Sequence, residues 1–136
     1  WARSSVQTRE NGLRLAEDAL IANPDLVAIY ASNDDLALGA VQAVKAAGKH
    51  GKVAVLGNNG TPPAMASVHR GDMSMTIQNS PVGFAIRAAA VADDFLRKDK
   101  VGADHLVVKF KVVEKNSACK LMPPPLRKKF GMPEKC

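Results

Sequence analysis

The chain has 136 residues, of which 46% are hydrophobic and 24% charged, and its formal net charge at pH 7 is +6. This composition is typical of one globular domain with a hydrophobic core, and no apolar run approaches the roughly 20 residues of a membrane-crossing helix. Residues 1–106 hold eleven basic and eleven acidic side chains, whereas residues 107–136 hold eight and two. Because only 4% of the residues are aromatic, and Phe110 and Phe130 are too few among these basic charges to form a stacking platform, we predict no nucleic-acid partner.

Helix and strand patterns alternate along the first part of the chain. Apolar residues at helical spacing predict a helix over 8–22. The continuous apolar run over 26–31 predicts a strand that is buried on both faces. A second helix is expected to open at Asp34, where an acidic side chain suits the positive end of the helix dipole, and to close at Gly48.

The alternation continues to about residue 113. The expected elements are a strand over 53–56, a turn over 57–60, a helix from Thr61 to Gly71, a strand over 73–77, a helix from Pro81 to about Lys98 and a strand over 106–113. Strands that alternate with helices favour right-handed crossovers and parallel pairing. We therefore predict an α/β fold, a three-layer sandwich with a mostly parallel, Rossmann-like sheet, in which residues 1–116 form a ligand-binding lobe.

The sequence changes character after Asn116. Residues 117–136 contain a triple proline and scattered basic side chains, and because proline interrupts helices and sheet ladders we predict an extended or disordered, basic and Pro-rich tail. Cys119 and Cys136 both lie in this tail, without a nearby histidine or a CxxC spacing, so we predict no metal site or cofactor. Two free thiols are the simpler interpretation, and a disulfide in an oxidising compartment is the alternative.

Asparagine stands at the end of three predicted strands. Asn33 follows the first strand, Asn58 and Asn59 follow the second, and Asn79 follows the third. Because the carboxyl ends of parallel strands share one edge of a sheet, we expect these side chains to converge there. An amide offers donors and an acceptor without charge, so this edge suits a neutral, hydroxyl-rich ligand. The alternative interpretation is structural, since asparagine is also common in turns.

Patterns that indicate catalysis are weak. GNNG at 57–60 is not a dinucleotide-binding fingerprint, and the chain contains no P-loop sequence. His50 and His69 lie beside basic residues in a predicted loop and near a helix end, where a surface position is expected. No serine lies in a nucleophile-elbow pattern. We therefore predict that the protein is not an enzyme.

Two neighbouring stretches of the chain also resemble a known family. They read ANPDLVAIYASNDDLALGAVQAVKAAGK and VAVLGNNGTPPAMASVHRGDMSMTIQNSP, and they are similar to the type I periplasmic binding proteins of the ribose-binding kind, the solute receptors of sugar ABC transporters. The resemblance covers roughly residues 7–116. It implies a two-lobed receptor that closes on a sugar, with this chain forming mainly the second lobe and lacking the N-terminal lobe.

The resemblance implies roles for individual residues. Asn33 matches a ligand-binding Asn of the family, Asn59 stands where the family has Asp, and Asn79 stands where it has Gln. Gln7 falls where the family often has an aromatic side chain that packs on the sugar. The segment 81–98 resembles a helix that family members place in the other lobe.

The resemblance further implies a monosaccharide or polyol as ligand, a membrane permease of an ABC transporter as partner, and a periplasmic or extracellular location. The effector-binding core of a LacI-type transcription regulator is the alternative, because such regulators share this lobe architecture. An upstream helix-turn-helix would indicate the regulator, and a signal peptide would indicate the receptor.

Overall fold

A computed structural model describes residues 6–98 and 109–136, which fall into two compact units. The first unit comprises the chain up to Gln78 together with Val112–Cys136, and the second unit is Asn79–Lys111.

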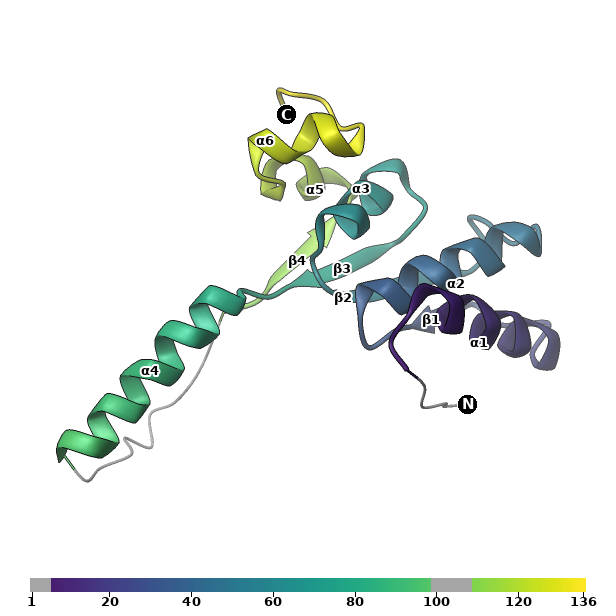
Figure 1. The fold of residues 1–136 in the computed structure, drawn as a ribbon. Coiled ribbons are helices and arrows are strands. Elements are labelled where there is room, and N and C mark those ends of the chain that lie inside the picture. Colours follow the sequence, from purple (N-terminus) through teal and green to yellow (C-terminus); the bar gives the residue numbers. More distant parts are fainter. Residues whose placement is uncertain (1–5, 99–108) are drawn as a thin grey trace. The chain divides into compact units, whose positions relative to one another are not determined.

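The first unit is built on a sheet with the strand order β1-β2-β3-β4 (Figure 1). β1 pairs in parallel with β2, β2 pairs in parallel with β3, and β4 returns beside β3 in the opposite direction. The elements are α1 (Arg9–Ala22), β1 (Ala28–Tyr30), α2 (Asp34–Ala46), β2 (Ala54–Asn59), α3 (Pro62–Arg70), β3 (Met75–Gln78), β4 (Lys111–Glu114), α5 (Lys115–Leu121), α6 (Pro124–Arg127) and η1 (Lys128–Phe130). The predicted α/β class with a mostly parallel sheet is confirmed.

The predicted helix boundaries agree with the structure where the sequence supplies a cap. Thr8 Oγ1 accepts a hydrogen bond from the Asn11 N–H at 3.3 Å, and Asn33 Oδ1 accepts one from the Leu36 N–H at 2.9 Å. Both bonds satisfy donors that the first helical turn leaves free. α3 ends at Arg70, and its C-cap Gly71 has a φ of +83°, the left-handed conformation that favours glycine at this position.

The prediction that the first strand is buried on both faces is wrong. β1 spans three residues, shorter than the predicted 26–31, and Tyr30 keeps 64% of its surface exposed. β1 is also the edge strand of the sheet formed by the residues that the structure describes, so no neighbouring strand covers its outer side. A continuous apolar run indicates a strand but does not show how many neighbours will cover it.

The predicted turn over 57–60 is also wrong, because β2 continues through the first three of these residues. Pairing with β3 extends the strand, and Asn59 lies opposite Gln78 in the register. The strand predicted over 106–113 is found in its second half as β4, and residues 106–108 lie outside the described residues.

α1 and α2 lie side by side with their backbones in contact at two glycines (Figure 1). A Cβ atom on Gly39 would lie 2.6 Å from the backbone nitrogen of Leu13, and one on Gly12 would lie 2.7 Å from Leu36 Cα. Real Cβ atoms essentially never come within 3.0 Å of another heavy atom. The two helices can therefore pack this closely only with glycine at both positions.

Gly39→Ala is expected to lower the free energy of unfolding by about 2 kcal/mol, because the added methyl group pushes α2 away from α1. This cost exceeds the gain of about 1 kcal/mol that alanine brings to a helix interior. Urea unfolding followed by far-ultraviolet circular dichroism measures the change. Gln42→Ala, on the exposed face of the same helix, is the matched control and should change stability by no more than about 0.5 kcal/mol. A Gly39→Ala protein as stable as the wild type would contradict the close packing.

The prediction of an extended or disordered tail is wrong. The C-terminal module (Lys115–Cys136) contains α5, α6 and η1, packs on α3, and buries Met122 and Met132 in the same core (Figure 1). Proline does not prevent this fold, because the second of the three consecutive prolines begins α6, where no intrahelical N–H is needed.

A disulfide between Cys119 and Cys136, with their Cα atoms 5.8 Å apart, closes this module. The interpretation of the two cysteines as free thiols is therefore wrong. The expected tail is a folded part of the first unit.

The second unit contains α4 (Pro81–Lys98), which matches the predicted helix. Ser80 Oγ accepts a hydrogen bond from the Gly83 N–H at 3.0 Å and supports the first turn of α4. The rings of Phe84 and Phe110 pack with their centroids 6.2 Å apart. Within the described residues, no helix has the length and apolarity needed to cross a lipid bilayer.

Candidate functional site

Hydrogen bonds join three of the predicted site residues beside the ends of β1 and β2. Asn33 Nδ2 donates to Gln7 Oε1 at 3.1 Å, and Gln7 Nε2 donates to Ser32 Oγ at 3.5 Å. Asn58 Nδ2 donates to the Ser32 carbonyl oxygen at 3.4 Å. Gln7, Ser32, Asn33 and Asn58 form an uncharged polar cluster, which we call the amide edge.

One residue of the amide edge also has a structural task. Asn33 caps α2 through its side-chain oxygen, so the structural interpretation holds for that atom. Each amide nitrogen carries two protons and uses only one of them in these bonds, which leaves a donor on Asn33 and another on Asn58. The edge can therefore bind a further polar molecule while it keeps its internal bonds.

Asn59 and Asn79 lie differently from the other predicted residues. Asn59 is exposed at the end of β2 with a φ of +120°, a conformation that residues other than glycine rarely adopt and that recurs at functional sites. A Cβ atom on the following Gly60 would lie 2.5 Å from Gln78 Cα, so the turn needs glycine there. Asn79 is the first residue of the second unit and is described with that unit.

Gln78 is a further candidate residue, which was not predicted from the sequence. This residue ends β3 directly opposite Asn59, which places a second amide side chain at the same edge. A glutamine at the end of an apolar run was a visible sign. The next residue, Asn79, follows the same apolar run, and only the strand register shows that Gln78 is the residue opposite Asn59.

A buried carboxylate lies beneath the amide edge. Asp34 is 1% exposed, and it accepts hydrogen bonds at 2.6 Å from the Thr61 N–H and at 2.6 Å from the Thr76 hydroxyl. The Thr76 oxygen in turn accepts one from the Gly60 N–H at 3.2 Å. This Asp34 network (Asp34, Gly60, Thr61 and Thr76) ties the start of α2 to the turn after β2 and to β3.

The Asp34 network corrects the simpler interpretation of Asp34 as a residue that only suits the helix dipole. Its neighbour Asp35 does lie on the surface, where it pairs with Arg9 Nε at 3.0 Å. Gly57 leaves room for the buried carboxylate, since a Cβ atom there would lie 2.5 Å from Asp34 Oδ1. Asp34 therefore positions the strand ends and does not itself face a ligand.

The chemistry available at the amide edge is hydrogen bonding by neutral groups. Amides and hydroxyls donate and accept without a charge, which matches the hydroxyl groups of a polyol in both directions. Among the residues that the structure describes, no group of three His, Cys, Asp or Glu side chains could hold a metal ion.

Comparison with known sequences shows that the chain is similar to binding proteins of import systems. The family described as "Periplasmic binding protein domain" matches residues 4–100. The ribose import binding protein of Salmonella typhimurium is 38% identical over 99 residues, which are 73% of this chain and 33% of that protein. The D-allose-binding periplasmic protein of Escherichia coli is 36% identical over 106 residues, which are 78% of this chain and 34% of that protein. The chain thus spans about a third of the length of these relatives.

Solved structures give the same result. One is a periplasmic solute-binding protein of an ABC transporter from Actinobacillus succinogenes with bound D-allose. It matches this chain with a TM-score of 0.75 and 34% sequence identity, and the match covers 87% of this chain and 42% of that protein's chain. Another is an ABC transporter solute-binding protein from Bacillus halodurans with bound myo-inositol. It matches this chain with a TM-score of 0.68 and 27% sequence identity, and the match covers 83% of this chain and 39% of that protein's chain. These neighbours share the mixed, mostly parallel sheet with helices on both sides.

Proposed function

Since the chain belongs to the periplasmic binding protein family, we propose that it forms part of a solute-binding protein that takes up a monosaccharide or a polyol. The relatives are named for the import of ribose and the binding of D-allose, and two solved neighbours hold D-allose and myo-inositol. All of these ligands are small, uncharged and rich in hydroxyl groups. The proposed role is therefore capture and delivery of a ligand, without a chemical reaction on it.

The amide edge is the observation that carries this proposal. Gln7, Asn33 and Asn58 lie within one hydrogen-bonded cluster, and free amide protons on Asn33 and Asn58 remain for a ligand. Open α/β sheets bind their ligands at the carboxyl ends of the strands, which is the edge that these side chains occupy. We propose ligand contacts for these three residues, for Asn59 with its neighbour Gln78, and for Asn79.

The proposal includes partners outside this chain. Because the chain spans a third of its relatives, we propose that a further lobe supplies the facing half of the binding cleft, and that α4 packs in that lobe. A membrane permease of an ABC transporter is the proposed recipient of the ligand. The Cys119–Cys136 disulfide supports a periplasmic location, since disulfides persist in oxidising compartments and are rare in the cytosol. For the same reason the disulfide argues against a LacI-type regulator, because such a regulator acts on DNA in the cytosol.

Calorimetry on the parent polypeptide with both lobes tests the function. D-ribose, D-allose, D-fructose and myo-inositol form the panel, and we expect saturable binding of at least one of them. The 136-residue chain alone should bind the same ligand far more weakly, because half of the cleft is absent. No binding of any neutral sugar or polyol to the parent would refute the proposed ligand class.

Asn33→Asp in the parent is expected to weaken ligand binding by about 1 to 3 kcal/mol, because it removes the amide donor at a desolvated site. Aspartate keeps the N-cap acceptor for α2, so folding stability should change little. Calorimetric titration and thermal unfolding of the same sample separate these two effects. Gln42→Ala removes an exposed amide farther along α2 and should bind like the wild type. Equal affinity of Asn33→Asp and the wild type would exclude Asn33 from the site.

A further inference from the structure

The dipeptide Asn-Gly occurs twice in the chain, at Asn11–Gly12 and at Asn59–Gly60. In this dipeptide the glycine nitrogen can attack the preceding side-chain amide, because glycine has no side chain to hinder the approach and adopts conformations that other residues avoid. The reaction replaces the amide of the asparagine by a carboxylate. The surroundings of each copy therefore determine whether it reacts in the folded protein.

The Asn59 copy lies at the surface, beside the amide edge. Asn59 is exposed at the end of β2, so water reaches its side chain. Among the residues that the structure describes, none forms a hydrogen bond with the Asn59 side-chain amide. This amide is therefore accessible and is not held by the fold.

The backbone nitrogen of Gly60 is connected to a buried base. Its N–H donates to Thr76 Oγ1 at 3.2 Å, and the Thr76 hydroxyl donates to Asp34 Oδ1 at 2.6 Å. Thr76 is 0% exposed and Asp34 is 1% exposed. Both hydrogen bonds point from the nitrogen toward the carboxylate, so they form a path along which a proton can leave the nitrogen. A base in such a position accelerates a reaction by removing the proton in the transition state.

The hydrogen bond to Thr76 does not compete with attack by the Gly60 nitrogen. A peptide group is planar, and its N–H lies in that plane, where the Thr76 oxygen accepts it. The nitrogen attacks a carbonyl carbon through its electrons perpendicular to the plane. The base and the Asn59 side chain can therefore act on the same nitrogen at the same time.

The Asn11 copy lacks these conditions. Gly12 lies in the first turn of α1, and its N–H donates to the Thr8 carbonyl oxygen at 2.9 Å. A carbonyl oxygen is a far weaker base than a carboxylate. Asn11 Nδ2 donates to the Val6 carbonyl oxygen at 3.0 Å, which holds the side chain. Gly12 is buried, and a Cβ atom on it would lie 2.7 Å from Leu36 Cα, so this backbone has no room for a ring.

We propose that Asn59 is a self-modifying site, at which the folded chain converts asparagine to aspartate. The Gly60 nitrogen forms a bond to Asn59 Cγ while its proton passes through Thr76 to Asp34. The Cγ–Nδ2 bond breaks, and the leaving group takes a proton from water and departs as ammonia. The hydroxide that remains adds to Cγ of the succinimide ring, and the bond to the Gly60 nitrogen opens. Asp34 then returns its proton to that nitrogen, so the net reaction consumes one water and releases one ammonia.

The packing of Gly60 favours one of the two products of ring opening. Opening at Cγ restores the original backbone and gives aspartate, whereas opening at the main-chain carbonyl of Asn59 gives isoaspartate and lengthens the backbone by one methylene group. A Cβ atom on Gly60 would lie 2.5 Å from Gln78 Cα, so this turn has no room for a longer backbone. We therefore expect aspartate.

The modification would change the chemistry of the ligand edge. A carboxylate accepts charge-assisted hydrogen bonds from hydroxyl groups, which are stronger than those that a neutral amide accepts. Conversion of Asn59 would therefore strengthen the binding of a hydroxyl-rich ligand. This effect on affinity rests on the proposed function, whereas the modification itself does not depend on it.

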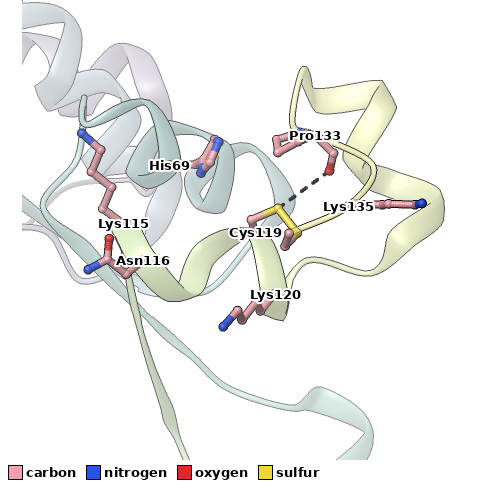
Figure 2. A pocket seen from close by; sticks show the side chains of 8 residues that line it. His69, Lys115, Asn116, Cys119, Lys120, Pro133 and Lys135 are labelled. Carbon is pink, nitrogen blue, oxygen red and sulfur yellow. Dashed lines mark hydrogen bonds between the residues drawn. A yellow bond between two sulfur atoms is a disulfide. The ribbon is translucent and has the colours of Figure 1, made fainter.

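Incubation of the 136-residue chain at neutral pH, followed by peptide mass spectrometry, tests the modification. In the folded chain, Asn59 should convert about a hundredfold faster than Asn11, which is the size of effect that a positioned base provides. In denaturing urea, where both copies lose their surroundings, the two rates should be similar. Asn116, exposed at the start of α5 (Figure 2) but followed by serine, controls for exposure alone and should convert much more slowly than Asn59.

Two variants of Thr76 test the proton path. Thr76→Val removes the hydroxyl and should slow the conversion of Asn59 at least about tenfold, whereas Thr76→Ser keeps the hydroxyl and should react like the wild type. Circular dichroism shows whether Thr76→Val folds, and if it does not, the rates of the folded and unfolded wild type still test the proposal. Equal rates at Asn59 and Asn11 in the folded chain, isoaspartate as the product, or a folded Thr76→Val chain that reacts like the wild type would overturn it.

Calorimetry on the parent polypeptide measures the effect on affinity. Asn59→Asp, which carries the product of the reaction, should bind the sugar or polyol about tenfold more tightly than the unconverted wild type. If neither form binds any neutral sugar or polyol, the proposed function fails and the modification stands on the mass spectrometry. Equal affinity of the two forms would leave the proposed function in place and refute the role of the modification in binding.

Discussion

Asp34→Ala is expected to lower the free energy of unfolding by about 3 kcal/mol, through the loss of two hydrogen bonds to a buried charged group. Both donors, the Thr61 N–H and the Thr76 hydroxyl, lie 2.6 Å from the carboxylate, which is 1% exposed. Without Asp34 these donors stay buried and unpaired, which costs more than the bonds alone. A loss of this size is a large share of the roughly 5 to 15 kcal/mol that stabilises a typical domain.

Urea unfolding of two matched variants isolates the role of burial. Asp35→Ala removes an adjacent aspartate whose ion pair with Arg9 lies at the surface, and it should cost no more than about 0.5 kcal/mol. Asp34→Asn keeps the volume but turns an NH₂ group toward a donor, so it should also destabilise the unit. Because the Asp34 network fixes Gly60 and Thr61 behind the amide edge, Asp34→Ala and Asp34→Asn should weaken ligand binding as well, whereas Asp35→Ala should not. Equal stability of Asp34→Ala and Asp35→Ala would show that the network contributes little.

Removal of the Cys119–Cys136 disulfide is expected to lower the free energy of unfolding of the module by about 3 kcal/mol. The two cysteines are 17 residues apart, and closing a loop of that size reduces the entropy of the unfolded chain by about this amount. The double variant Cys119→Ala/Cys136→Ala avoids a remaining free thiol and keeps the buried position of Cys119 apolar. Urea unfolding of the wild type with and without a reductant, beside the double variant, measures the effect.

The reductant supplies the control for this prediction. It should destabilise the wild type to the level of the double variant and leave the double variant unchanged. Thiol titration of the denatured, unreduced wild type should detect no free cysteine. A reductant without effect on the wild type, or two free thiols, would show that the disulfide does not form in solution.

Local patterns in the sequence predicted the order of elements and several boundaries. The apolar spacing from residue 8 and the acidic side chain of Asp34 predicted two helix starts, and the structure places an N-cap at each, Thr8 and Asn33, through hydrogen bonds that reach only three positions along the chain. Gly71 marked a helix end for a similar local reason, since it takes the left-handed conformation itself. The asparagines at the strand ends likewise indicated an edge with uncharged polar side chains, which the structure brings together for Asn33 and Asn58 through Gln7 and Ser32.

Features that depend on distant residues were not predictable in this way. The bond from Thr76 to Asp34 spans 42 positions, so no local pattern could show that Asp34 is a buried link between strand ends. The register that sets Asn59 opposite Gln78, the glycines between α1 and α2, and the disulfide have the same origin. The sequence by itself determined the α/β alternation and the polar strand ends, because these follow from periodicity and caps within a few residues. Only the tertiary structure decided burial, pairing and the folded C-terminal module, because these follow from packing between segments that are far apart in the chain.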